Sequence, residues 1–423
     1  MRGLLAFFPS WYIFLVCLLF WIGPWKFPDV SIGFSLYLAV VLLAILFGQV
    51  TGMALGNRLK FRVCHSKNSM QGRHVLNWSI VISWILIFPT FYARTGSIFP
   101  DIIYGITYPG EAYRRGIEAV HPGLEYIRIL FSPLLFIFLP LSVKYYSVLP
   151  LWRKGLVVLF VLANFALYIS MGVNRGIVDY IAGGVFLYFV HISASSGLRV
   201  KSIWKIGLLL TPIFVGALVF FASGQLLREG SGAPIGYYPA ADLYSSIRPQ
   251  EIDDPLLRFV AVIYNQLTIY LVQGFYGAGL IFERGIEFSL YGIGNSDFLI
   301  RNAAKIFGDS VYHRSAIYAY EYSMGWLHGN FWFSIIPWVA SDIGFAGVIF
   351  FSFLSAFAYS LAFFIYKKSS EWLSFCILAI FFYMFLYFPA NNYMAQSGEY
   401  LLASLALLFL WVIRVVRTGW HRV

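Results

Sequence analysis

Long apolar runs separated by short polar stretches dominate the pattern of hydrophobic and polar positions along the chain. Several of these runs approach or exceed the roughly 20 residues with which an α-helix crosses a bilayer. A membrane-spanning β-barrel would show alternating segments of about ten residues instead. The pattern predicts an all-α polytopic integral membrane protein. The ten predicted spans are Leu4–Ile22, Ile32–Ala54, Leu76–Tyr92, Ile127–Val143, Gly155–Met171, Gly176–His191, Ile206–Ser223, Ile343–Tyr366, Trp372–Phe388 and Tyr400–Ile413.

The first run, Leu4–Ile22, has only Arg2 before it and no small-residue cleavage pattern after it. We therefore expect an uncleaved first span rather than a signal peptide.

A stretch of more than a hundred residues late in the chain, Gly224–Asp342, lacks a clean span. Within it, Arg258–Phe282 is apolar but carries a polar stripe on one helical face, formed by Arg258, Asn265, Gln266 and Gln273. This predicts a helix that lies in the membrane interface or re-enters it, with the stripe towards a cavity. The alternative is an eleventh span paired with a short twelfth near Trp332–Ala340, which gives 10–12 spans. We expect one transmembrane domain, 1–423, with 224–342 as a loop region within it.

Composition agrees with a membrane protein and excludes several other classes. The chain is 60% hydrophobic and 12% charged, whereas soluble domains carry about 25% charged residues. The net charge is +11, but the basic residues are dispersed among apolar spans, which excludes a nucleic-acid-binding domain. The three cysteines and seven histidines show no disulfide framework and no metal-ligand spacing. The sequence holds no nucleotide-binding loop, so no cofactor is expected.

The lysines and arginines in the loops predict the orientation of the chain. One set of helix ends collects 17 of the 30 basic residues and a single acid, Glu371. This side is predicted to be cytoplasmic, with both termini inside. The opposite face then holds three segments of interest: Arg94–Arg128, the short turn at Asn174, and the loop region 224–342.

The turn "SMGVNRGIVD" places Arg175 between two predicted spans. A charge at this depth is costly unless it is paired or solvated. Asp179, four residues on, is a possible partner along a helix. Arg175 is then either a snorkelling arginine at a span end or a phosphate contact, because the guanidinium fork suits phosphate oxygens.

The segment "RNAAKIFGDSVYHRSAIYAYEYSMGWLHGNFW" concentrates basic and aromatic residues. Its basic members are Arg301, Lys305, His313, Arg314 and His328. Arginines with aromatic rings suit a sugar–phosphate ligand, and an interfacial aromatic belt is the alternative.

Two acids nearby are candidate bases. Asp297 follows the turn "YGIGNS", in which Gly292 and Gly294 indicate close backbone approach. Asp342 lies at the start of a predicted span, where a carboxylate is also favoured by the helix dipole alone.

Three motifs resemble the bacterial oligosaccharide repeat-unit polymerases, the O-antigen polymerase (Wzy-type) family. They are "GVNRG" between two spans, "YLVQGFYGAGLIFE" followed by "GIGNSDF" in the late loop, and "WVASDIGFAGVIFF" leading back into the membrane. The span count and the long late loop match as well, so the resemblance covers nearly the whole chain.

The resemblance implies a GT-C-like glycosyltransferase of the bacterial inner membrane with a periplasmic active face. Such an enzyme polymerises undecaprenyl-diphosphate-linked oligosaccharide units and releases undecaprenyl diphosphate, without metal or nucleotide. A chain-length regulator and a flippase are implied partners beside the membrane lipids. An O-antigen ligase-type transferase and a flippase or transporter of the lipid-linked unit are the alternative functions.

Site residues follow from combining the resemblance with the residue chemistry. Arginine can stabilise the charge of a departing diphosphate, and a carboxylate or histidine can take the acceptor proton. The predicted diphosphate contacts are Arg175, Arg314 and Arg301. The predicted bases are Asp342, His328 and Asp297. The predicted sugar contacts are Phe275, Tyr276 and Trp326, which are equally consistent with ordinary interfacial aromatics.

Overall fold

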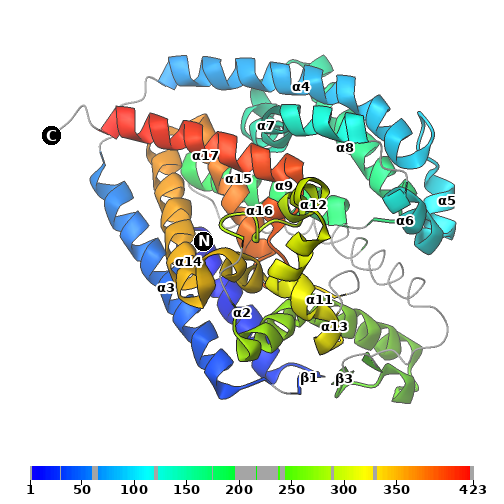
Figure 1. The fold of residues 1–423 in the computed structure, drawn as a ribbon. Helices are drawn as coiled ribbons and strands as arrows, with labels where there is room; N and C mark the ends of the chain where they lie inside the picture. The colour runs from blue at the N-terminus through cyan, green and yellow to red at the C-terminus, as the bar shows by residue number, and fades with distance from the viewer. Residues whose placement is uncertain are drawn as a thin grey trace. The chain divides into compact units, whose positions relative to one another are not determined.

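Helices make up most of the computed structural model (Figure 1). It describes residues 2–28, 30–59, 65–118, 122–173, 175–195, 216, 237–238, 243–286, 290–326 and 331–419. In this part of the chain, eight helices are long and apolar enough to cross a membrane, and two shorter apolar helices, Phe8–Ile22 and Trp372–Leu386, accompany them. The prediction of an all-α polytopic membrane protein is confirmed at this level.

Nine of the ten predicted spans coincide with helices in the described residues. The remaining predicted span, Ile206–Ser223, lies outside the described residues except for Gly216. The late apolar segment is a continuous helix, α11 (Pro255–Arg284), of 30 residues, and it is among the eight helices long enough to span. The helical part of Trp332–Ala340 begins at Ile335, at the start of α14 (Ile335–Ser369), and belongs to a short helical segment that ends at a kink at Gly344.

The chain forms two compact units, and both combine long apolar helices. Unit 1 comprises Met1–Arg58, Gly232–Leu361 and Phe381–Leu401. Unit 2 comprises Leu59–Ser231, Ala362–Ile380 and Leu402–Val423.

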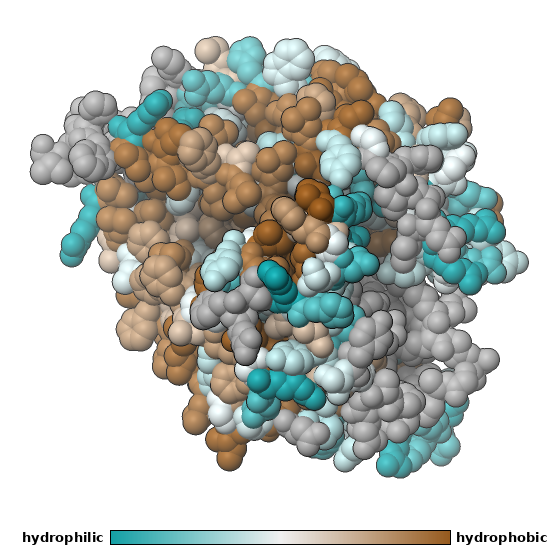
Figure 2. Space-filling view, in the orientation of Figure 1, coloured by the Kyte–Doolittle hydropathy of each residue, from teal (hydrophilic) through white to brown (hydrophobic). Residues whose placement is uncertain are grey.

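Unit 1 is built around helices that pack through small residues. Its helices are α1 (Arg2–Ala6), α2 (Phe8–Ile22), α3 (Ile32–Arg58), α11, α12 (Asp297–Phe307), α13 (Ala316–Met324), the part of α14 up to Leu361, the end of α15 (Trp372–Leu386), α16 (Tyr393–Gln396) and the start of α17 (Gly398–Gly419), with 3-10 turns η3 (Pro249–Glu251) and η4 (Asp309–Arg314). Gly48 lets α3 approach α14 closely, because a Cβ there would lie 2.2 Å from the Phe353 carbonyl oxygen. The other side of α3 exposes apolar residues such as Phe47 (62%), and Figure 2 shows apolar side chains over this helix, as lipid contact requires.

A small antiparallel sheet in unit 1 explains the polar stripe of α11. Its strands are β1 (Trp25–Lys26), β3 (Leu243–Ser245) and β2 (Tyr237–Tyr238), in that order. Asn265 on α11 is fully buried; it accepts a hydrogen bond from Ser245 Oγ (2.8 Å) and donates one to the Ile247 carbonyl (3.0 Å). Trp25 Nε1 donates to Thr268 Oγ1 at 3.0 Å. This part of the stripe satisfies buried polar groups against the sheet instead of facing an open cavity.

Unit 2 is a set of helices whose neighbours in sequence pack together. They are α4 (His65–Thr95), α5 (Ile102–Thr107), α6 (Pro109–Glu118), α7 (Pro122–Tyr145), α8 (Leu151–Ser170), α9 (Arg175–Ser195), the end of α14, most of α15 and most of α17, with the 3-10 turn η1 (Tyr146–Val148). Helix α4 lies along α7 and α8 (Figure 1). The short helix α5 docks on α8 through Gly105, where a Cβ would lie 2.0 Å from the Ile169 carbonyl oxygen.

We expect Gly105→Ala to destabilise unit 2. The methyl group would overlap a backbone oxygen, and overpacking of this kind costs about 1–3 kcal/mol. Thermal unfolding in detergent measures the effect. Gly110→Ala on α6 is the matched control, because its Cβ would meet no atom within 4 Å. Equal melting temperatures for the two variants would contradict the close docking of α5 on α8.

Candidate functional site

A buried carboxylate in unit 1 holds an exposed arginine. Asp297 is the first residue of α12, whose N-cap Ser296 accepts a hydrogen bond from the Leu299 amide (3.2 Å). The helix dipole favours a carboxylate in this first turn. Arg301 lies one turn on, with its guanidinium 2.7 Å from Asp297 Oδ2, and the Tyr318 hydroxyl of α13 donates to Asp297 Oδ1.

The side chains of Asp297 and Arg301 differ sharply in exposure. The Asp297 side chain is 13% exposed and the Arg301 side chain is 55% exposed. Burial, followed by the neighbouring Asp297 carboxylate, raises the pKa of Tyr318 well above its ordinary value. The phenol therefore remains a proton donor at neutral pH. The arrangement presents a pre-oriented guanidinium at the surface, and such a group can hold phosphate oxygens.

The second predicted arginine of this segment lies on an adjoining element. Arg314 ends η4 and is exposed, and η4 packs against both α12 and α13. Arg301 and Arg314 therefore belong to one packed group of short elements. His328, predicted as a base, lies outside the described residues.

Asp342 lies on α14, and its carboxylate is enclosed by the loop of residues 292–295. It is 7% exposed, and its carboxylate accepts four hydrogen bonds. The donors are the amides of Gly292 (2.8 Å), Gly294 (2.8 Å) and Asn295 (2.9 Å) and the Asn295 side-chain amide (2.8 Å). These contacts account for Asp342 without any catalytic role, and its assignment as a base stays a prediction.

The connection between α15 and α17 lies against the start of α12. The Asn392 side chain donates to the Asn295 carbonyl at 2.6 Å, and the Ser296 hydroxyl donates to the Ala395 carbonyl. Among the described residues, twelve buried side-chain atoms lack a hydrogen-bond partner, and two of them, Asn391 Oδ1 and Gln396 Nε2, lie in this connection. Buried amides without partners are costly, so these two atoms mark a place where a polar ligand or water would be stabilised.

Sequence reasoning missed this connection, although a signal was present. The polar run "PANNYMAQSGEY" interrupts the apolar segments of α15 and α17. Tyrosine rings also meet there: Tyr387, just before the run, stacks on Tyr393 with a centroid distance of 4.6 Å, and the tilted rings of Tyr393 and Tyr400 are 4.4 Å apart.

The three aromatic residues predicted to contact sugar belong to the core of unit 1. Phe275 and Trp326 are fully buried and Tyr276 is 3% exposed. Trp326 stacks on Phe331 with a centroid distance of 4.1 Å, and its other neighbours include Tyr276 at 5.1 Å. Their rings are covered by protein, so in this structure they have a packing role and offer no open face to a sugar.

Arg175 belongs to unit 2, where it is the first residue of α9 and half-buried. The preceding turn is tight: Gly172 has φ 61°, and a Cβ at Gly176 would lie 2.1 Å from the ring of Tyr168. Asp179, the predicted partner, is 7% exposed, and neither charged side chain is without an interaction in the structure.

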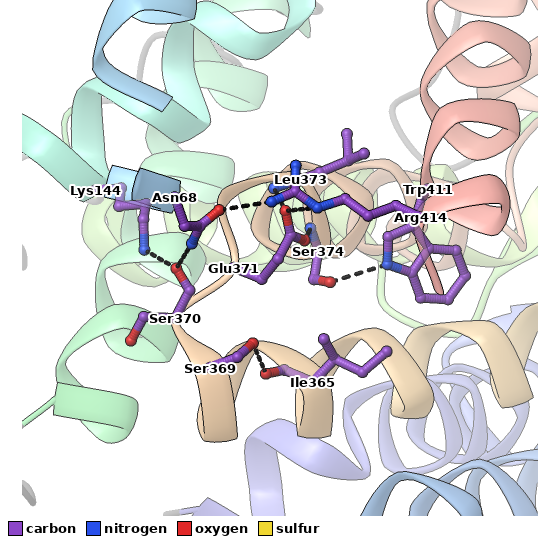
Figure 3. Close-up of polar contacts among 10 residues, drawn as sticks. All are labelled: Asn68, Lys144, Ile365, Ser369, Ser370, Glu371, Leu373, Ser374, Trp411 and Arg414. Atoms are coloured by element: carbon purple, nitrogen blue, oxygen red, sulfur yellow. Dashed lines mark hydrogen bonds and ion pairs between the residues drawn. The ribbon is translucent and has the colours of Figure 1, made fainter. Parts of the chain in front are cut away.

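A second polar cluster, in unit 2, was also missed from the sequence (Figure 3). Glu371 precedes α15, and its carboxylate accepts hydrogen bonds from the amides of Leu373 (3.0 Å) and Ser374. Arg414 of α17 lies 3.3 Å from the same carboxylate and donates to Asn68 of α4. The cluster therefore ties three helices together at the one acid that the charge pattern had singled out.

No group of three or more His, Cys, Asp or Glu side chains that could hold a metal ion occurs within the described ranges. Comparison with known proteins found no matching family model, curated protein or solved structure.

Proposed function

We propose that the protein polymerises undecaprenyl-diphosphate-linked oligosaccharide units at the periplasmic face of the bacterial inner membrane. The observation that carries the proposal is the exposed Arg301 guanidinium, which the buried Asp297 carboxylate holds. Both residues belong to α12, which follows the long apolar helix α11 and precedes α14 along the chain. A fixed cation beside a membrane suits a lipid diphosphate, which must be bound where its chain stays in the bilayer.

In the proposed reaction, a hydroxyl at the non-reducing end of an incoming unit attacks the anomeric carbon of the growing chain. The new glycosidic C–O bond forms while the bond to the diphosphate oxygen breaks, and undecaprenyl diphosphate leaves with that electron pair. Pre-oriented arginines lower the barrier by stabilising the charge that develops on the leaving oxygen. We assign this role to Arg301 and Arg314, which belong to one packed group of elements in unit 1. Arg175, in unit 2, stays a predicted diphosphate contact.

A base accepts the hydroxyl proton as the new bond forms. Asp297, His328 and Asp342 stay the candidates. Asp297 is favoured by its position beside Arg301. Asp342 is disfavoured because each of its carboxylate oxygens already accepts two hydrogen bonds.

The sugar contacts need a different assignment from the buried Phe275, Tyr276 and Trp326. The connection between α15 and α17 offers half-buried Tyr387 and Tyr400 together with the side-chain amides of Asn391 and Gln396. Aromatic rings and amides together suit a saccharide, which presents apolar C–H faces and hydroxyl groups. We propose this connection as the sugar-binding segment.

Analysis of surface glycans in a strain that lacks the gene tests the proposed reaction. We expect short products that carry a single repeat unit, with long chains restored by the wild-type gene. Complete loss of attached glycan would point to a ligase instead, and lipid-linked units confined to the inner leaflet would point to a flippase. Long chains of normal abundance in the deletion strain would overturn the proposal.

A further inference from the structure

The loop of residues 292–295 in unit 1 surrounds a carboxylate in the way that protein loops surround bound anions. Three backbone amides and one side-chain amide converge on the two oxygens of Asp342 at 2.8 to 2.9 Å. Successive backbone N–H groups that point into one concavity form a nest, which is a recurrent anion-binding structure.

The local backbone is shaped for this contact. Gly292 has φ 98°, and the preceding Tyr291 has φ 41°, which is strained for a residue with a side chain. A Cβ at Gly294 would lie 2.9 Å from Asp342 Oδ1 and 2.8 Å from Ser341 Cβ, so only glycine admits the carboxylate there. On the other side, Gly344 (φ 68°, ψ 172°) breaks α14 two residues after Asp342.

The nest is joined directly to the group that holds Arg301. Asn295 donates to Asp342, and its carbonyl accepts from Asn392. The next residue, Ser296, caps α12, and the one after it is Asp297. A shift of the loop would therefore displace the carboxylate that orients the exposed guanidinium.

We propose that residues 292–295 form an oxyanion-binding nest whose built-in ligand is the Asp342 carboxylate, and that Asp342 is thereby a positioning residue for Asp297 and Arg301. The site takes a small carboxylate or similar oxyanion. Its role is independent of which ligand Arg301 binds, so it stands apart from the proposed polymerase activity.

Removing the built-in ligand should open the site to an external one. In Asp342→Ala, formate has the size and charge of the lost group. We expect sodium formate to raise the melting temperature of the purified full-length variant in detergent with a saturable dose response, compared with sodium chloride at equal concentration. The wild type, whose nest is filled, should show no such response.

Hydrogen–deuterium exchange reports the positioning directly. We expect exchange in a peptide covering 290–301 to rise at least tenfold in Asp342→Ala and to return towards the wild-type rate with formate, while a peptide from α3 stays unchanged. Asp309→Ala is the matched control, because it removes an exposed carboxylate at the start of η4. It should leave both the 290–301 peptide and the formate response as in the wild type.

Two results would overturn the proposal. One is a folded Asp342→Ala protein that keeps wild-type protection of 290–301 or gains nothing from formate. The other combines two variants: Asp342→Ala aggregates in formate and chloride alike, while Asp342→Asn folds with a protected loop. An uncharged amide would then suffice at a place where the nest requires an anion.

Discussion

Replacing Glu371 by alanine should destabilise the protein by about 1–3 kcal/mol, because hydrogen-bond donors around a buried carboxylate would lose their acceptor. Glu371 is 3% exposed and lies 3.3 Å from the Arg414 guanidinium. Its loss would also leave the amides of Leu373 and Ser374 without their acceptor at the start of α15.

The consequence should extend to the helices that the cluster connects. Asn68, which accepts from Arg414, donates to the Ser370 carbonyl at 3.2 Å, and Lys144 donates to the same carbonyl at 2.9 Å (Figure 3). Ser370 has φ 51° in the turn between α14 and α15. These hydrogen bonds hold a turn that is unfavourable on its own, so weakening them would add to the expected loss.

Chemical unfolding in detergent measures this loss, and the chain offers a matched control. Glu251 makes an ion pair with Arg248 at 2.9 Å, but both side chains are more than 60% exposed. Exposed pairs contribute about 0–1 kcal/mol, so Glu251→Ala should change stability little. An equal effect of the two substitutions would show that the Glu371 cluster does not hold unit 2 together.

The second large effect is expected at Arg301. Removal of one group that stabilises a transition-state charge lowers the rate by about 10²–10³-fold, and we expect Arg301→Ala to slow chain lengthening to this degree. The folded protein should persist, because the Arg301 side chain is 55% exposed. Arg301→Lys should recover only part of the activity, since lysine keeps the charge but loses the planar fork.

Arg248→Ala is the control for Arg301, because it also removes an exposed arginine from an ion pair in unit 1. We expect wild-type chain lengths for that variant. Normal lengthening by Arg301→Ala at a normal protein level would remove Arg301 from the proposed site.

The helices could be predicted from the sequence because apolar runs of bilayer length have one simple solution in lipid. The predicted boundaries differ from the structure mostly at polar ends, as at α4, which starts at His65 instead of Leu76. Hydropathy does not detect such ends, since a helix can continue into water after its apolar part stops.

The contacts around the site could not be predicted in the same way. Asp342 and Gly294 are 48 residues apart in sequence, and the Asn392–Asn295 contact spans 97 residues. No local pattern encodes such pairings. Phe275, Tyr276 and Trp326 illustrate the same limit, because an aromatic residue near a membrane surface can equally stack on a ligand or fill a core.

The polar residues of α11 have a different setting from the expected cavity: Asn265, Gln266 and Gln273 are buried, whereas Arg258 is exposed. Asn265 is satisfied by β3 and the residue two positions beyond it. The short strands of this sheet have two or three residues each, too few for an alternating pattern to be recognised.

In the proposed function, the chain itself joins lipid-linked repeat units. The most direct test of this function is an assay of the purified protein in detergent with undecaprenyl-diphosphate-linked units extracted from the deletion strain, run alongside Arg175→Ala, Arg301→Ala and Arg314→Ala. We expect a ladder of longer oligomers with the wild type and a strong reduction with the arginine variants. Units that remain single with folded wild-type protein, while an active control polymerase extends its own substrate under the same conditions, would contradict it.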